Sequence, residues 1–150
     1  MEGLRWVRMT DDEMSDFLGR GGTGTLSFST AIDDPPFSIP VSYGYDEDAN
    51  AFYFRLAFPE GATKEGVVDR PVSFVAHRRT DRGYRSVVAA GTLEEVTDMP
   101  YDSSAVQGMW AVEIPEIDIF DRPPEDVAFR HFRLAPETLT GRKEVRSNES

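Results

Sequence analysis

The stretch FSIPVSYGYDEDANAFYFRL, residues 37–56, decides the fold. Residues 37–45 alternate polar and apolar side chains, with the period of two that is typical of a half-buried β-strand. Residues 46–50 are polar or small and predict a turn, and residues 51–56 form an aromatic-rich second strand. The two runs together predict a β-hairpin. Pro40 lacks a backbone N–H, so it indicates a sheet edge or a bulge within the first strand.

Further strand-like runs surround this hairpin. They cover residues 25–29, 72–77, 84–96 and 127–134, and a charged turn at 78–83 joins two of them into a second hairpin. The pattern predicts a mainly β protein, a small six-stranded antiparallel β-barrel with peripheral helices. We expect one domain over residues 1–142, followed by a charged, disordered tail over residues 143–150.

Helices are expected only in short pieces. Thr10 and Glu13 have the spacing of a capping box, which predicts a helix that continues to about Arg20. Short helical segments are also expected within residues 62–68 and 101–110. The glycine-rich run 19–24 matches G-x-G-x-x-G, but a helix precedes it and a strand follows. Because a dinucleotide site needs the reverse order, this run is interpreted as a flexible connector.

The chain is strongly acidic, with 27 acidic and 16 basic residues and a net charge of −11. Such a surface repels nucleic-acid phosphates and anionic lipid, which excludes nucleic acid and membranes as general partners. Fourteen of the basic residues are arginine and two are lysine. Acidic, lysine-poor chains suit molar salt, where charge repulsion is screened, so we expect a halophilic archaeon as the source. The alternative is an ordinary acidic cytosolic protein.

Residues for classical catalysis are scarce. The chain has no cysteine, which removes disulfides, thiolate metal sites and cysteine nucleophiles. His77 and His131 lack neighbours at metal-ligand spacing, so no metal site is predicted. No apolar run resembles a membrane span or a signal peptide, and a cytoplasmic location is expected. If the protein is an enzyme, its reactive chemistry should come from a cofactor.

One loop stands out, FPEGATKEG, residues 58–66. It holds Lys64, one of the two lysines, after Gly61 and Thr63. Loop amides, a hydroxyl and an ammonium group suit a phosphate monoester. Arg55 lies on the strand before this loop. The alternative interpretation of Lys64 is a solvated surface charge.

These segments together resemble the pyridoxamine 5′-phosphate oxidase-like flavin-binding split-barrel superfamily, most closely its nitroimidazole-resistance reductase branch. The resemblance runs from about Met9 to Val96 and continues faintly to Arg142. Its segments are MTDDEMSDFLGR, GTLSFS, FSIPVSYGYD, AFYFR with GATK, RPVSFVAH, YRSVVAAGTLEEV and, near the end, LTGR.

The resemblance implies a homodimer with FMN bound between two six-stranded split barrels. Lys64 matches the phosphate-binding lysine of the family, whereas Thr63 stands where the family has arginine. Trp110 is expected to stack near the partner's flavin, or else to anchor the interface or core. The remaining cofactor-binding residues that the resemblance implies are Val41, Ser42 and Tyr43 beside the ring, Phe54, Arg55 and Leu56 toward the phosphate, and Arg85 with Ser86 at the ring or phosphate.

The implied function is that of an FMN-dependent oxidoreductase whose substrate and electron donor the sequence does not identify. The residues that bind pyridoxal phosphate in the true oxidases, and the C-terminal basic motif of those enzymes, are not recognisable, which argues against vitamin B6 oxidation. Three alternatives stay open: a deazaflavin-binding protein, a haem-binding protein and a non-catalytic flavin-binding protein.

Overall fold

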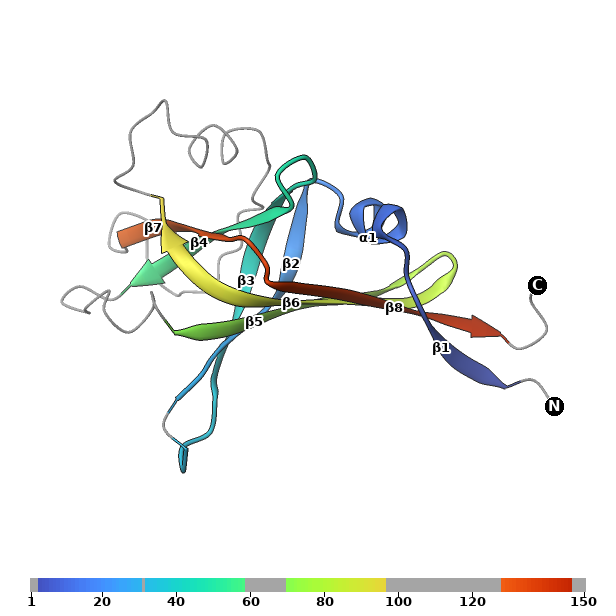
Figure 1. Ribbon diagram of the computed structural model, residues 1–150, viewed down its shortest axis with the longest axis horizontal. Coiled ribbons are helices and arrows are strands. Elements are labelled where there is room, and N and C mark those ends of the chain that lie inside the picture. The colour runs from blue at the N-terminus through green and yellow to red at the C-terminus, as the bar shows by residue number, and fades with distance from the viewer. Residues whose placement is uncertain (1–2, 31, 59–69, 97–127, 147–150) are drawn as a thin grey trace.

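The computed structural model describes residues 3–30, 32–58, 70–96 and 128–146. It contains one helix and eight strands in these ranges (Figure 1). In chain order they are β1 (Leu4–Arg8), α1 (Asp11–Leu18), β2 (Gly21–Phe28), β3 (Phe37–Asp46), β4 (Ala51–Phe58), β5 (Pro71–Thr80), β6 (Gly83–Glu95), β7 (Ala128–Leu134) and β8 (Thr138–Arg146).

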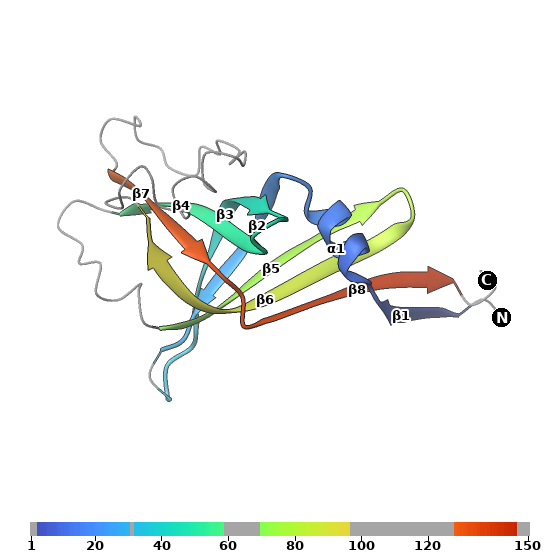
Figure 2. The same cartoon turned by 45° about the horizontal axis from the view of Figure 1, so that its top comes forward.

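Six strands close into a ring, as the sequence predicted. The sheet order is β1-β8-β6-β5-β2-β3-β4-β7, and an additional pairing between β6 and β7 joins its far end back to the middle. Strand β6 makes this closure possible because residues 93–95 pair with β7, whereas residues 85–90 pair with β8. Strands β8 and β1 therefore lie outside the ring, and the start of β1, paired with the end of β8, extends beyond the barrel (Figures 1 and 2).

The two predicted hairpins are confirmed. Strands β3 and β4 pair from Tyr43 opposite Phe54 to Asp46 opposite Ala51, and β5 pairs with β6 along the whole length of β5. Pro40 pairs only with Thr25 of β2, in a part of β3 that β4 does not reach. The missing N–H of proline is thus accommodated at a local sheet edge.

Aromatic rings fill the barrel interior. Phe74 of β5 is fully buried, and its ring centroid lies 5.2 Å from that of Tyr43, 5.3 Å from that of Phe52 and 5.0 Å from that of Phe54. Tilted and edge-on contacts at such separations are favourable for aromatic rings. These side chains come from β3, β4 and β5, so the core fixes these three strands relative to one another.

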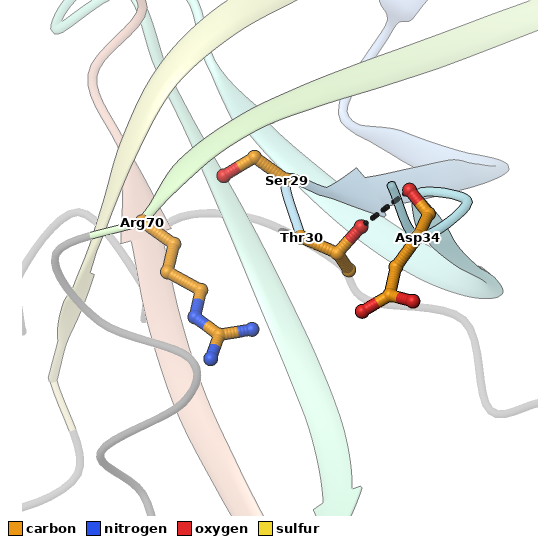
Figure 3. Close-up of a pocket in the computed structure, with 4 residues that line it drawn as sticks. All are labelled: Ser29, Thr30, Asp34 and Arg70. Atoms are coloured by element: carbon orange, nitrogen blue, oxygen red, sulfur yellow. Dashed lines mark hydrogen bonds between the residues drawn. The ribbon is translucent and has the colours of Figure 1, made fainter. Parts of the chain in front are cut away.

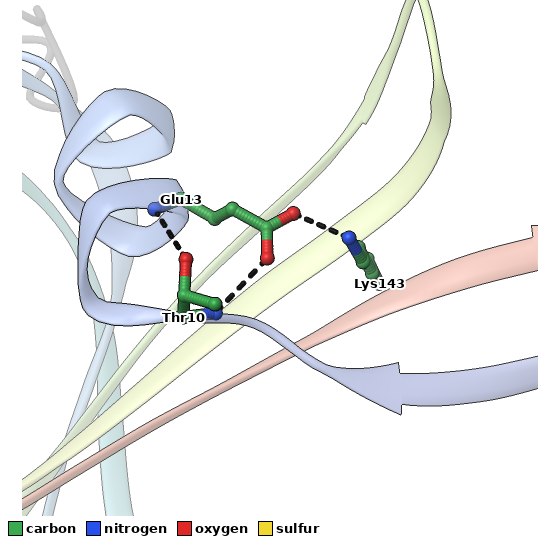
Figure 4. A network of polar contacts seen from close by, with 3 residues as sticks. All are labelled: Thr10, Glu13 and Lys143. Atoms are coloured by element: carbon green, nitrogen blue, oxygen red, sulfur yellow. Dashed lines mark hydrogen bonds and ion pairs between the residues drawn. The ribbon is translucent and has the colours of Figure 1, made fainter.

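Helix α1 begins with the predicted capping box. The Thr10 hydroxyl accepts a hydrogen bond from the Glu13 amide, and the Glu13 carboxylate accepts one from the Thr10 amide (Figure 4). The same carboxylate forms an ion pair with Lys143 of β8. The Lys143 hydrogen bond, followed by that of Thr10, lowers the pKa of Glu13 to about 2.

The disordered tail predicted from Lys143 onward is wrong for residues 143–146, because β8 continues to Arg146 and pairs with β1. Strand β1 was not expected at all. Residues 147–150 lie outside the described part of the chain, as do the helical segments predicted within 62–68 and 101–110. In the described ranges, no helix is long and apolar enough to cross a membrane.

The glycine-rich connector is also corrected. Strand β2 starts at Gly21, so only Gly19 and Arg20 connect it to the helix, and Gly19 has the positive φ of 60° that favours glycine. Gly24 has no room for a side chain, because a Cβ there would lie 2.5 Å from the Val75 carbonyl oxygen and 2.6 Å from the Phe74 ring. Glycine in this strand serves close packing rather than flexibility.

Candidate functional site

The sheet has one face toward the core and one face away from it, which we call the outer face. Successive residues of a strand point to opposite sides, and directly paired residues share a side. On β6, Val87 and Ala89 are buried in the core, so Ser86, Val88 and Ala90 belong to the outer face. The central side chains of this face are small and uncharged: Thr23, Thr25, Ser27, Ser38, Ser42, Ser73, Val75, Val88, Ala90, Thr138 and Thr140.

Charged residues lie at the margins of the outer face, and most of them are basic. Strand pairing assigns six arginines but only three acidic residues to this face within the described strands. The arginines are Arg8, Arg55, Arg79, Arg133, Arg142 and Arg146, and the acids are Asp46, Glu94 and Glu144. In a chain of net charge −11, the outer face is therefore a locally basic surface. It is suited to an anionic ligand.

Four of the predicted cofactor residues point away from this face. Val41, Tyr43, Phe54 and Leu56 are buried in the hydrophobic core. The Tyr43 hydroxyl donates to the Leu18 carbonyl at 3.0 Å. Burial raises the pKa of Tyr43, while the nearby charge of Arg78 opposes this effect. These four residues can reach a ligand on the outer face only through backbone atoms.

Ser42 and Arg55 do belong to the outer face. Ser42 lies opposite Thr23 of β2 and is 9% exposed. Arg55 of β4 lies opposite His131 of β7. Burial, and then the positive charge of Arg55, lower the pKa of His131. The imidazole is therefore neutral at pH 7, and Arg55 is the charged group of the pair.

The predicted polar pair on β6 is divided between the two faces. Ser86 lies on the outer face, between His77 of β5 and Arg142 of β8. Arg85 lies on the inner side, opposite Arg78 and Lys143, and its buried Nε has no hydrogen-bond partner among the described residues. One ligand on the sheet surface cannot contact both side chains, because consecutive strand residues diverge.

Three predicted residues, Thr63, Lys64 and Trp110, lie outside the described residues. Their assignment to the phosphate and the ring stays a prediction from the sequence.

Tyr53 was not among the predicted site residues, although it belongs to the outer face beside Arg55. It is fully buried, lies opposite Arg133 of β7, and its hydroxyl makes no hydrogen bond within the described part of the chain. Burial raises the pKa of Tyr53, whereas the neighbouring Arg133 guanidinium opposes this effect. The Arg133 guanidinium donates to Glu94 at 3.0 Å. An aromatic residue in an aromatic-rich strand carries no sequence signal that distinguishes it from core.

A separate depression lies at the end of β2 (Figure 3). Ser29, Thr30, Asp34 and Arg70 line it, and its volume is about 440 Å³. The Thr30 hydroxyl donates to the Asp34 carbonyl at 3.0 Å. None of these residues belongs to the predicted site. The described residues also contain no group of three or more histidine, aspartate or glutamate side chains that could hold a metal ion.

Comparisons with known proteins agree with this architecture. A protein with FAD-binding in its name, from Mesorhizobium loti, has a TM-score of 0.62 at 22% identity over 95% of this chain and 99% of its own. A Bacteroides thetaiotaomicron protein named for 5-nitroimidazole antibiotic resistance has a TM-score of 0.53 at 18% identity, covering 98% of this chain and 93% of its own. The FAD and haem binding protein of Mycobacterium smegmatis has a TM-score of 0.58 at 12% identity, covering 89% of this chain and 71% of its own.

No curated protein matches the chain with statistical significance. The family model described as pyridoxamine 5′-phosphate oxidase matches residues 10–143. This match covers helix α1, the whole six-stranded ring and the first part of β8 up to Lys143. The chain therefore belongs to the pyridoxamine 5′-phosphate oxidase family.

Proposed function

We propose that this protein is a homodimeric flavoprotein that binds FMN on its outer face and acts as a flavin-dependent oxidoreductase. One observation carries the proposal: the sheet surface opposite the core is small and uncharged at its centre and basic at its margins. A planar uncharged ring with a phosphate at the end of its side chain matches both parts of that surface.

The centre of the outer face suits the ring. Thr25, Val75 and Val88 lie in one row across β2, β5 and β6, with no long side chain among them. Small side chains let a flat ring approach the sheet closely, and neighbouring backbone groups and hydroxyls can then meet its polar edge.

The margin next to β4 suits the phosphate. A phosphate monoester needs charge-assisted donors, and arginine offers several in a fixed geometry. Arg55 lies on this margin, on the strand that leads into the loop with Lys64. We assign phosphate binding to Arg55 and Lys64, with Thr63 assisting.

Bound flavin would supply the electron-transfer chemistry, and the protein would supply binding, orientation and electrostatics. Ser42 and the backbone of residues 41–43 would orient the ring on β3. Burial and the charge of Arg55 lower the pKa of His131, which favours a neutral imidazole, so the positive charge on this margin comes from guanidinium groups. The substrate and the reductant would be small molecules.

Haem is the second candidate cofactor. One similar structure is named for binding both FAD and haem. His131 is a neutral imidazole on the outer face and is of the type that coordinates haem iron. A haem protein of this chain would lose its axial ligand in His131→Ala, whereas a flavoprotein would keep its chromophore.

Titration of cofactor-free protein with FMN tests the proposal. We expect saturation at one flavin per subunit, followed by reduction of the bound flavin when a nicotinamide cofactor is added without oxygen. Bound flavin that nicotinamide cofactors do not reduce would limit the function to flavin binding or require a different reductant. Failure to bind FMN, FAD or a deazaflavin would contradict the proposal.

A further inference from the structure

We propose that the inner side of the sheet beneath helix α1 binds one small oxyanion, of the phosphate or carboxylate type, at a site centred on Arg85 of β6. Arg85 lies directly opposite Arg78 of β5 and directly opposite Lys143 of β8. Neighbouring strands are about 4.8 Å apart, so the three cationic side chains start from backbone positions within about 10 Å. The site is on the opposite side of the sheet from the outer face that we assign to FMN.

Helix α1 meets this row of cations at both ends. At one end the Glu13 carboxylate forms an ion pair with Lys143 (Figure 4). At the other end Arg78 donates to the Phe17 carbonyl at 2.7 Å, and its guanidinium carbon lies 4.1 Å from the centroid of the Phe17 ring. Glu13 and Phe17 are four residues apart on one face of the helix. The helix therefore supplies a partner for each outer cation of the row and none for the central one, Arg85.

Arg85 has no counterion in the described part of the chain. No carboxylate of the described ranges forms an ion pair with it. Its Nε is buried and has no hydrogen-bond partner there. The burial of Nε shows that the guanidinium is held against the protein rather than extended into water. The residue as a whole is still partly exposed, so a small anion can reach the guanidinium from solvent.

The local charge favours an anion at this position. Among the described residues, Glu13 is the only carboxylate paired with the row, so three cations share one negative charge. Asp16, elsewhere on α1, is exposed and makes no ion pair with Arg85. Like charges directly opposite each other destabilise a strand pair, and a partly buried cation without a partner adds a further cost. An oxyanion bound at Arg85 would offset both costs.

The donors of the site suit an oxyanion better than a halide. Arginine presents its N–H groups in a planar fork that matches two oxygens of one carboxylate or phosphate. The Lys143 ammonium has three donors, and its hydrogen bond to Glu13 uses one of them. An oxyanion can therefore take two bonds from Arg85 and a further one from Lys143. Chloride offers a single acceptor atom and should bind much more weakly.

Thermal unfolding of the FMN-saturated protein tests the site, because saturating FMN also fills the phosphate-binding margin of the outer face. Phosphate or acetate at ten times its dissociation constant should raise the melting temperature by about 3–6 °C above that in KCl of the same ionic strength. A rise with phosphate alone would assign a tetrahedral oxyanion, and a rise with acetate alone a carboxylate. The comparison does not require flavin, so a chain that fails to bind FMN would contradict the proposed function and leave this test in place.

Matched variants separate the site from general salt effects. Phosphate also stabilises proteins because it is excluded from their surface, so the decisive quantity is the difference between the wild type and Arg85→Gln. Arg85→Gln should abolish the saturable rise. Arg79→Gln removes the same charge from the outer face of β5, where the Arg79 guanidinium lies 5.4 Å from the centroid of the Tyr84 ring. This control should keep the whole rise.

Two further measurements complete the test. Without phosphate or acetate, Arg85→Gln should be at least as stable as the wild type, because it removes the central one of three like charges. Calorimetric titration of the wild type with phosphate or acetate should show one saturable site per chain. An equal rise in the wild type and in Arg85→Gln, or no saturable binding, would overturn the proposal. A large loss of stability in Asp16→Asn without any oxyanion effect would instead identify Asp16 as the counterion of Arg85.

Discussion

Replacing Gly24 with alanine tests the packing that holds the ring together. Its Cβ would lie 2.5 Å from the Val75 carbonyl oxygen and 2.6 Å from the Phe74 ring. Phe74 is fully buried among other rings, and the carbonyl belongs to the sheet backbone, so neither neighbour can move freely. Overpacking of this kind costs about 1–3 kcal/mol. The lower entropy of an unfolded alanine offsets less than about 1 kcal/mol of that.

We therefore expect Gly24→Ala to lower the free energy of unfolding by about 2 kcal/mol, or the melting temperature by about 4–8 °C for a chain of this size. Gly22→Ala is the matched control on the same strand and face, where the closest contact of a Cβ is 3.2 Å, to the Tyr43 ring. Urea unfolding followed by circular dichroism should show a clearly smaller loss for Gly22→Ala. A Gly24→Ala protein as stable as the wild type would refute the assigned packing of β2 against β5.

Three further predictions follow from the structure and the sequence. Because the pKa of Glu13 is lowered in the folded state, its carboxylate stabilises the fold above the ordinary carboxyl pKa, and this contribution is lost as pH falls toward 2. Glu13→Gln should therefore lower the free energy of unfolding by about 1 kcal/mol at pH 7 and by almost nothing at pH 2. Urea unfolding at both pH values measures this, and an equal loss at both would contradict the assigned ion pair. Lys64→Ala should weaken FMN binding by about 1.5–3 kcal/mol, roughly tenfold to a hundredfold in the dissociation constant. A fluorescence titration measures this, and an unchanged affinity would show that Lys64 is a solvated surface charge. Val88 lies at the centre of the outer face and is 39% exposed, so Val88→Glu places a carboxylate there without disturbing the core. It should abolish flavin binding while the free energy of unfolding stays within about 1 kcal/mol of the wild type. Normal FMN affinity in this variant would show that the flavin binds elsewhere.

The halophilic source is a separate prediction from composition. A net charge of −11 should make the protein gain stability as KCl is raised, because salt screens the self-repulsion of the folded state. Thermal unfolding at low and molar KCl measures this directly. An equal melting temperature in both would favour the ordinary acidic cytosolic protein.

The hairpins and helix α1 could be predicted because their signals are local. Alternation along residues 37–45, the polar turn after it and the capping box of Thr10 and Glu13 each act within a few residues. Strand β1 and the end of β8 could not be predicted in the same way. The segments LRWVR and KEVR are short and charged, and they form strands because they pair with each other across most of the chain. The ion pair between Glu13 and Lys143 is another contact that no local pattern indicates.

The sequence predicted which strands contribute to the candidate site, but not which of their side chains face the outer surface. The family resemblance led to β3, β4 and β6, which do contribute to one sheet surface. It did not separate Ser42, which faces outward, from Val41 and Tyr43, which pack in the core. It also treated Arg85 and Ser86 as one polar pair, although strand geometry sends them to opposite faces. The basic margin of the outer face arises only when arginines from β1, β4, β5, β7 and β8 are brought to one surface.

The chromophore of the protein purified without added cofactor tests the central claim most directly. We predict the visible absorption of oxidised flavin, and release of FMN after denaturation, in a ratio near one flavin per subunit. The matched Val88→Glu protein should be colourless under the same conditions. A wild-type protein that is colourless and does not take up flavin, or one that shows a haem spectrum that disappears in His131→Ala, would contradict the proposed flavoprotein.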